Sequence, residues 1–227
     1  MCSSDLKKRF ARIDDLGVSP AEFRLLQRLN TQHPDVQFRL VIGSDILREG
    51  QRWHRFDEVL RLARVAAGDT VLDLYSGAGL FAGCIAAAEP GVAEVVAVES
   101  SIDAVRDARR SLSDLGTVTL VTADVPSWLG EHAADVFDVV VADPPRAGVG
   151  QESARIMAAM ARRAIVYVAC EPSSLARDTQ ILRECGWELR ILTAFDAFPM
   201  TSHVECVALF TRPESHAEPA GSLERQP

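Results

Sequence analysis

The chain has 227 residues, of which 48% are hydrophobic and 25% are charged. This is typical of a globular soluble protein with one medium-sized domain and an appendage. No apolar run approaches the roughly 18 residues that cross a bilayer, and the N-terminus lacks the apolar segment of a signal peptide, so a membrane or secreted protein is not expected. The formal charge of −8, from 24 basic and 32 acidic residues, lacks the basic footprint of a nucleic-acid-binding protein.

Five cysteines are present, an odd number, and no two form a C-x-x-C pair. This pattern excludes a regular disulfide framework and a metal site built on paired cysteines. We therefore expect a cytoplasmic monomer without a metal ion. Most of the cysteines should be small buried residues, which leaves open which one is reactive. They are Cys2, Cys84, Cys170, Cys185 and Cys206.

The first 62 residues contain a helix-like stretch at 20–32, a strand-like run at 38–42 and a second helix that reaches Leu62. These elements are too few for an independent core, so we expect an appendage rather than a domain. Residues 63–212 form the predicted catalytic domain. Residues 213–227 are polar and contain proline and glycine, which predicts a disordered tail.

Between Thr70 and Phe210, apolar runs rich in β-branched residues alternate with amphipathic or alanine-rich segments. This alternation predicts a parallel sheet covered by helices on both faces. The last two runs leave no room for a crossover helix, so the last strand should be antiparallel. The expected fold is α/β: a doubly wound, seven-stranded, mostly parallel sheet. The predicted strands are 70–75, 93–98, 117–121, 137–142, 164–169, 187–192 and 203–210, and the predicted helices are 80–88, 101–113, 151–162 and 173–185.

The first of these strands ends near Asp73 and Tyr75 and enters a turn that contains Gly77 and Gly79, followed by Leu80. Glycines at a strand–helix turn let the backbone approach a ligand and adopt positive φ. The turn therefore predicts a nucleotide-binding half-site, although a glycine turn of this kind also fits a dinucleotide fold.

Acidic residues follow the next two strands. Glu99 lies 20 residues beyond Gly79, where a carboxylate can accept both ribose hydroxyls, and Asp124 can meet the base of a bound nucleoside. Ligands of open α/β sheets bind at the carboxyl ends of the strands, where these residues should meet.

Two features favour S-adenosylmethionine over NAD as the ligand. Asp73 stands where dinucleotide enzymes usually have an apolar residue, and its carboxylate can face a cationic ligand. The fourth strand runs into Asp143-Pro144-Pro145-Arg146, a signature of class I methyltransferases that act on planar nitrogenous substrates.

Four stretches of the chain carry a specific resemblance. LDLYSGAGLFA (72–82), DPPRAGVG (143–150), VACEPSSLARD (168–178) and FDAFPMTSHVECVALF (195–210) are similar to the catalytic domain of the RNA uracil-5-methyltransferase family. The resemblance covers residues 63–211 and implies a class I, Rossmann-like fold, S-adenosylmethionine as methyl donor and a uridine of transfer or ribosomal RNA as substrate.

By this resemblance Cys170 is the nucleophile and Glu205 the base. Uracil C5 is a poor nucleophile, and attack of a thiolate on C6 turns the ring into an enolate that can accept a methyl group. A base must then remove the C5 proton so that the thiol can leave. A free thiol has a pKa of about 8.5, so the N-terminus of the helix predicted from Ser173, together with Arg146, should favour its ionisation.

The remaining predicted roles follow from the same motifs. His203 and the Pro144–Arg146 segment should contact substrate, and Phe195, Phe198 and Pro199 could form the wall of a pocket for a flipped or looped uridine. Arg177 and Asp178 fit a structural ion pair as well as a role in RNA binding. The predicted cofactor site consists of Asp73, Tyr75, Gly77, Gly79, Leu80, Glu99, Asp124 and Asp143.

The sequence departs from the family pattern ahead of this domain. The family's RNA-binding β-barrel, central domain and F-x-Q motif are not visible. Within the domain, Ser76 replaces a common cysteine, and Leu80 replaces a common asparagine.

Residues 20–59 instead resemble a fragment of nicotinate-nucleotide adenylyltransferase, through Gly43, Asp45 and Trp53, without that family's H-x-G-H motif. The opening MCSSDL resembles translated adapter sequence. Our hypothesis is a chimeric or truncated reading frame that binds RNA weakly.

Three other functions remain open. A thiol hydrolase would use Cys170 and His203, and would need a third orienting group and an oxyanion hole. An NAD-dependent oxidoreductase would use the glycine turn. A truncated or fused module would bind the cofactor and modify nothing.

Overall fold

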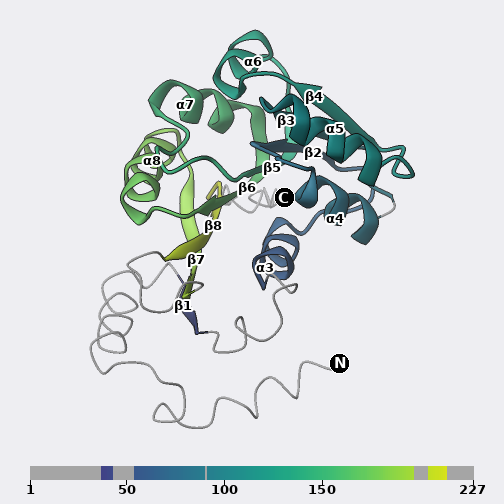
Figure 1. Cartoon of the computed structure of the whole chain (residues 1–227). Coiled ribbons are helices and arrows are strands. Elements are labelled where there is room, and N and C mark those ends of the chain that lie inside the picture. The colour runs from purple at the N-terminus through teal and green to yellow at the C-terminus, as the bar shows by residue number, and fades with distance from the viewer. Residues whose placement is uncertain (1–36, 43–53, 90, 197–203, 214–227) are drawn as a thin grey trace, which may run out of the picture.

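The computed structural model describes residues 37–42, 54–89, 91–196 and 204–213, which form one sheet of eight strands with helices on both faces (Figure 1). The strands are β1 (Gln37–Ile42), β2 (Thr70–Leu74), β3 (Glu94–Glu99), β4 (Val118–Thr122), β5 (Phe137–Ala142), β6 (Ala161–Ala169), β7 (Glu188–Asp196) and β8 (Glu205–Thr211). The helices are α3 (His54–Ala63), α4 (Leu80–Ala88), α5 (Ile102–Ser111), α6 (Val125–Glu131), α7 (Gln151–Met160) and α8 (Pro172–Glu184).

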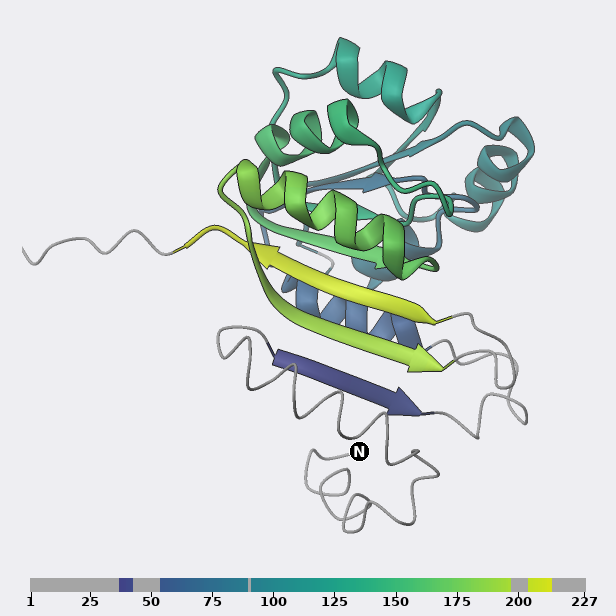
Figure 2. The same cartoon turned by 90° about the vertical axis from the view of Figure 1, so that its left-hand side faces the viewer.

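The strand order is β1-β7-β8-β6-β5-β2-β3-β4. Strands β2 to β6 are all parallel, whereas β8 lies between β6 and β7 and is antiparallel to both. The predicted doubly wound sheet with an antiparallel last strand is therefore confirmed. Strand β1, which comes from the predicted appendage, adds an eighth strand parallel to β7 at the sheet edge (Figure 2).

Two local predictions differ from the structure. The helix predicted to reach Arg162 ends at Met160, because Ala161 already pairs with Phe137 of β5. Helix α6 was not expected; Asp124 caps it by accepting a hydrogen bond from the Ser127 amide at 3.1 Å. The helix predicted at 20–32 and the tail beyond 213 lie outside the described residues.

The core consists of two apolar layers, one on each face of the sheet. Helices α6, α7 and α8 cover one face, and α3 and α4 pack against the other. Side chains of β5 alternate between them: Val140 and Ala142 face the first layer, and Val139 and Val141 face the second. Burying one such side chain contributes about 1.5–3 kcal/mol, so β5 is fixed in register by both layers. Of the described helices the longest, α8, has 13 residues, and none could cross a membrane.

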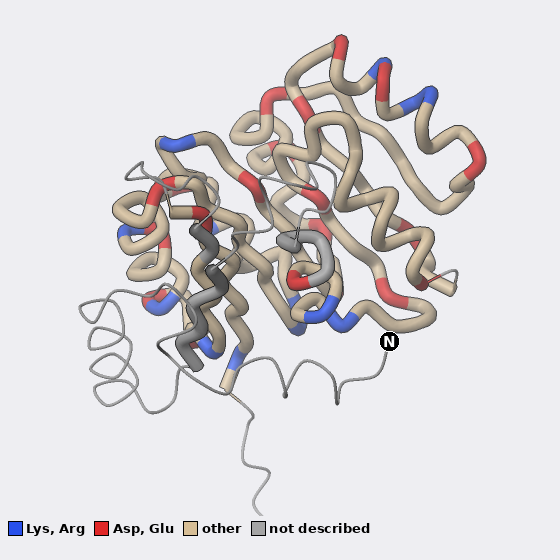
Figure 3. Tube along the Cα trace, turned by 60° about the horizontal axis from the view of Figure 1, so that its bottom comes forward, with Lys and Arg blue, Asp and Glu red and all other residues tan. Residues whose placement is uncertain are grey.

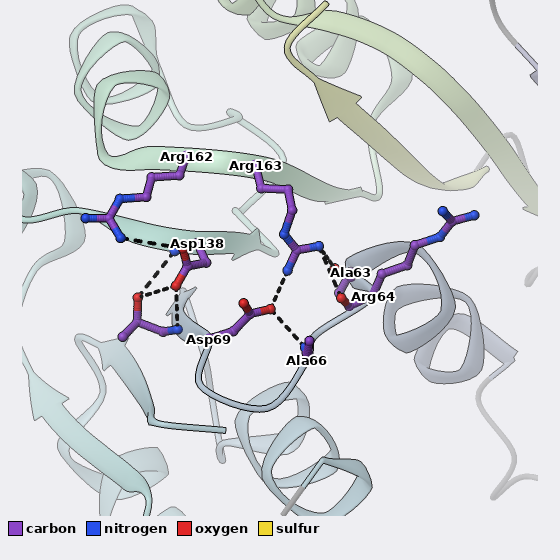
Figure 4. Close-up of polar contacts among 8 residues, drawn as sticks. Ala63, Arg64, Ala66, Asp69, Asp138, Arg162 and Arg163 are labelled. Carbon is purple, nitrogen blue, oxygen red and sulfur yellow. Dashed lines mark hydrogen bonds and ion pairs between the residues drawn. The ribbon is translucent and has the colours of Figure 1, made fainter. Parts of the chain in front are cut away.

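Arginine and aspartate side chains join α3 to the amino ends of the central strands (Figure 4). The Arg163 guanidinium pairs with Asp69 and donates to the carbonyl oxygens of Ala63 and Arg64 at 3.4 and 3.1 Å. These carbonyls end α3, where Arg64 has a φ of 45°. Arg163 therefore satisfies helix-terminal acceptors that α3 itself cannot.

We expect Arg163→Ala to lower the free energy of unfolding by about 1–2 kcal/mol, because three contacts of a half-exposed guanidinium are lost. Arg162→Ala is the matched control. Its side chain is 62% exposed and, among the described residues, its guanidinium pairs only with Asp138, at 3.6 Å, so a change within about 0.5 kcal/mol is expected. Urea unfolding of both variants measures the difference. Equal losses would contradict the proposed role of Arg163 at the end of α3.

Candidate active site

The turn between β2 and α4 has the strained backbone that the glycine pattern predicts. Gly77 and Gly79 have φ values of 54° and 78°, and Tyr75, a non-glycine residue, has a φ of 61°. A Cβ atom on Gly79 would lie 2.7 Å from Leu112 Cδ1 and 3.2 Å from Ala108 Cβ, whereas one on Gly77 would meet nothing within 4 Å. Gly79 is thus required by both its conformation and its contact with α5.

We expect Gly79→Ala to destabilise the protein by about 1–3 kcal/mol, from strain at positive φ and from crowding against the Cβ atom of Ala108 and the end of the Leu112 side chain. Gly77→Ala, which meets only the conformational strain, should lose about 1 kcal/mol. Thermal unfolding of the two variants gives the comparison. A Gly77 variant as unstable as the Gly79 variant would show that packing against α5 is unimportant.

Three carboxylates come together beside this turn: Asp73, Glu99 and Asp143. Asp73 is completely buried; its Oδ2 accepts a hydrogen bond from the Ala82 amide at 3.0 Å, and its Oδ1 has no partner among the described residues. Burial, opposed by the Ala82 hydrogen bond and supported by the charges of Asp143 and Glu99, raises the pKa of Asp73 to about 8. An unpartnered buried oxygen among like charges favours a cationic ligand.

The other predicted cofactor residues lie around the same edge. Glu99 accepts hydrogen bonds from the amides of Gly77 at 3.0 Å and Ser101 at 2.7 Å, so it joins the glycine turn to the start of α5. Asp124 is exposed and caps α6. Burial, with the charges of Asp124 and Asp178, raises the pKa of Tyr75 to about 12, so its hydroxyl is neutral.

Two large apolar side chains are unusually exposed here: Leu80, 52% exposed, at the start of α4, and Ile102, 68% exposed, at the start of α5. No motif in the sequence points to Ile102. The available signal is an apolar residue at the first position of a mostly polar helix, three residues after Glu99.

The ends of β6 and β8 bring the predicted nucleophile and base to the same edge of the sheet. The last pair of the β6–β8 register is Ala169 with Cys206. Cys170 directly follows β6, and Glu205 is the first residue of β8, so each adjoins a member of this pair in the chain. Glu205 is 8% exposed, and Cys170 is partly exposed. His203, Phe198 and Pro199 lie outside the described residues, as does the side chain of Phe195.

Helix α8 begins directly after Cys170. Glu171 is its N-cap and accepts hydrogen bonds from the Ser173 amide at 3.3 Å and hydroxyl at 3.0 Å. The positive end of the helix therefore begins two residues after Cys170, and Glu171 already binds part of it.

The Asp-Pro-Pro-Arg segment follows β5 at the same edge. The Asp143 amide donates to the Leu74 carbonyl at 3.2 Å, which ties this segment to β2. Pro144 is buried and Arg146 is exposed. The Arg177–Asp178 ion pair that the sequence left open is present, with Nε and Oδ1 3.4 Å apart.

The architecture places the chain among class I methyltransferases. Residues 58–170 match the family model for the methyltransferase small domain. The fold is similar to that of precorrin-6y C5,15-methyltransferase from Geobacter metallireducens, with a TM-score of 0.59 over 76% of this chain and 93% of that one at 15% identity.

Residues 132–213 match the model for tRNA (uracil-5-)-methyltransferase. The chain is 39% identical to the 23S rRNA (uracil(1939)-C(5))-methyltransferase RlmD of Shewanella woodyi over 79% of its own length and 41% of that protein's. It is 44% identical to an uncharacterised RNA methyltransferase of Streptomyces coelicolor, over 63% and 31% of the two chains. The tRNA (uracil-54, C5)-methyltransferase of Pyrococcus abyssi, solved with S-adenosyl-L-homocysteine, superposes with a TM-score of 0.56 at 30% identity, over 68% and 37% of the chains.

Residues 58–213 belong to the RNA uracil-5-methyltransferase family. The chain spans about a third to a half of the length of the curated relatives it matches. Within the part that the structure describes, no three His, Cys, Asp or Glu side chains group as metal ligands.

Proposed function

We propose that the chain transfers a methyl group from S-adenosylmethionine to C5 of a uridine in ribosomal or transfer RNA, through a covalent bond between Cys170 and C6. The observation that supports the proposal is the β6–β8 register, whose last pair, Ala169 with Cys206, adjoins Cys170 and Glu205 in the chain at the carboxyl end of β6. The names of the relatives supply the substrate class: ribosomal RNA for the Shewanella protein and transfer RNA for the Pyrococcus protein.

The residues at the β2–α4 turn fit the cofactor. The unpartnered Asp73 Oδ1 and the neighbouring carboxylates suit its positive charge, and the exposed side chains of Leu80 and Ile102 offer apolar surface to its adenine. Glu99, at the end of β3, would accept the ribose hydroxyls in addition to the Gly77 and Ser101 amides. When bound, the cofactor supplies the methyl group that C5 acquires.

The protein's own residues perform the other steps. The Cys170 thiolate adds to C6, forming the S–C6 bond while the π electrons of C5=C6 pass to the ring as an enolate. Once C5 is methylated, the Glu205 carboxylate takes the C5 proton. The electrons of that C–H bond restore C5=C6, the S–C6 bond breaks and the thiolate is regenerated.

The net negative charge of the domain bears on how tightly it should bind RNA. Residues 63–212 contain 12 basic and 20 acidic residues, and in Figure 3 basic and acidic positions are interspersed over the described fold. Affinity for RNA depends on neutralising phosphates, so this domain should bind RNA weakly by itself. The four free cysteines among the described residues fit a reducing cytoplasm. We propose that the protein acts there, as a monomer.

RNA transcripts of transfer RNA and of 23S rRNA fragments that contain 5-fluorouridine test the proposal. Fluorine at C5 cannot leave as a proton, so the wild-type chain with S-adenosylmethionine should form a denaturation-resistant complex. Cys170→Ala should form none, and Cys185→Ala, which changes a partly buried cysteine at the other end of α8, should match the wild type. A wild-type chain that forms no complex would overturn the proposal, and burst acylation by an activated ester would favour a hydrolase.

A further inference from the structure

A buried carboxylate on α8 holds the loop that follows the Asp-Pro-Pro-Arg segment. Asp178 is completely buried, and its Oδ2 accepts hydrogen bonds from the Val149 amide at 2.7 Å and from the Tyr167 hydroxyl at 2.6 Å. Val149 belongs to the loop between β5 and α7, and Tyr167 belongs to β6. One side chain therefore connects three segments that meet at the carboxyl edge of the sheet.

The loop is shaped to fit this carboxylate. Gly148 has a φ of 78°, its amide donates to the Pro145 carbonyl at 2.8 Å, and a Cβ atom there would lie 2.4 Å from Asp178 Oδ2. Arg177 adds a second bond, from its Nη2 to the Ala147 carbonyl. Both ends of the Arg177–Asp178 ion pair thus bind backbone of the same loop.

The contact of Asp178 with this loop matters because the loop and α8 each adjoin a predicted part of the active site. The loop carries Pro144 and Arg146, for which the sequence motif predicts contact with the substrate, and α8 begins two residues after Cys170. Burial, followed by the hydrogen bond to Asp178, raises the pKa of Tyr167 strongly, so its hydroxyl stays protonated and donates.

We propose that Asp178 is a positioning residue, which fixes the substrate-facing loop at 144–149 relative to the nucleophile Cys170. The inference rests on the proposed function for the reaction that it serves. Arg177 takes part through its hydrogen bond to the Ala147 carbonyl of the same loop. Misplacement of reacting groups by about 1 Å costs about 100-fold in rate, so loss of the tether should slow attack on C6.

Four variants separate this role from general stability. Asp178→Ala removes both hydrogen bonds. Asp178→Asn keeps an oxygen that can accept from both the Val149 amide and the Tyr167 hydroxyl, so it should preserve the tether. Gly148→Ala displaces the loop while leaving Asp178 in place. Gly186→Ala is the control, because its φ is 84° and a Cβ there meets nothing within 4 Å, at the far end of α8.

Three measurements are made on each full-length variant: amide exchange of Val149, the rate of complex formation with 5-fluorouridine RNA, and affinity for S-adenosylhomocysteine. For Asp178→Ala and Gly148→Ala we expect exchange at Val149 to rise at least about tenfold and complex formation to slow about 10- to 100-fold. Affinity for S-adenosylhomocysteine should be unchanged, and Asp178→Asn and Gly186→Ala should form the complex at close to the wild-type rate.

Complex formation at the wild-type rate in a variant whose Val149 amide exchanges rapidly would overturn the positioning role. An equal slowing in Gly186→Ala would also overturn it, because general destabilisation would then explain the effect. If the wild-type chain forms no complex, the proposed function fails. Amide exchange at Val149 still reports separately on the tether in that case.

Discussion

Glu205→Gln is expected to accumulate a covalent protein–RNA complex on ordinary uridine RNA, whereas the wild-type chain releases its product. Glutamine has nearly the size of glutamate but cannot take a proton. Addition of Cys170 to C6 and methylation of C5 should proceed, and the C5 proton should remain. The S–C6 bond then cannot break, so product release should slow by about 10²- to 10⁴-fold.

The burial of Glu205 is the reason that we expect no other base to replace it. The side chain is 8% exposed and lies at the first residue of β8, one rung beyond the Ala169–Cys206 pair. Water therefore has little access to replace the carboxylate as base. A gel under denaturing conditions, with labelled S-adenosylmethionine, measures both the complex and the methyl group within it.

Glu171→Gln is the matched control, since this carboxylate adjoins Cys170 in the chain but caps α8. It should turn over without accumulating a complex. Cys170→Ala should yield neither complex nor methylated RNA. Release of product by Glu205→Gln at the wild-type rate would contradict the assignment of the base.

The sequence predicts the fold well because the β-branched runs of β2, β3 and β5 are buried on both sides, and only a covered parallel sheet accommodates them. It does not predict that β8 inserts between β6 and β7, because pairing of distant strands leaves no local signal. That insertion puts the end of β6, which Cys170 follows, next to the start of β8, where Glu205 lies. The prediction that these two residues act together therefore came from the resemblance and not from any periodicity.

The remaining differences have similar causes. Helix α6 has seven residues and includes a proline, so its pattern is too short to detect. Arg162 and Arg163 continue a helical pattern, but Asp138 and Asp69 lie close enough to bind them in a strand. From the sequence, Asp178 is expected only to form an ion pair with Arg177. The fold shows in addition that Gly148 and Val149 lie against its carboxylate.

Asp73→Asn is expected to stabilise the ligand-free protein, increasingly as the pH rises from 5 to 8. The pKa of Asp73 is 3.8 ordinarily and about 8 in the folded chain. Between these values the folded state binds the proton that the unfolded state has lost, so stability falls with rising pH, by about 1.4 kcal/mol per unit at most. Asparagine does not titrate and escapes this loss.

Urea unfolding of the wild type and Asp73→Asn at pH 5 and pH 8 tests the stability effect. The advantage of the variant should be larger by at least about 1 kcal/mol at pH 8. Asp138→Asn is a control of opposite sign: hydrogen bonds from Thr70 hold the pKa of Asp138 below its usual value, so that variant should lose stability at both values of pH. An advantage of Asp73→Asn that is the same at pH 5 and pH 8 would contradict the raised pKa.

The same carboxyl group should couple cofactor binding to proton release. A sulfonium cation beside Asp73, Glu99 and Asp143 favours the ionised form, so binding of S-adenosylmethionine at pH 7 should release up to about one proton. Calorimetric titration in buffers of different ionisation enthalpy measures this number. S-adenosylhomocysteine, which lacks the sulfonium charge, should release less. In Asp73→Asn the difference between the two ligands should disappear, and if it persisted, the charge that meets the sulfonium would have to come from Glu99 or Asp143.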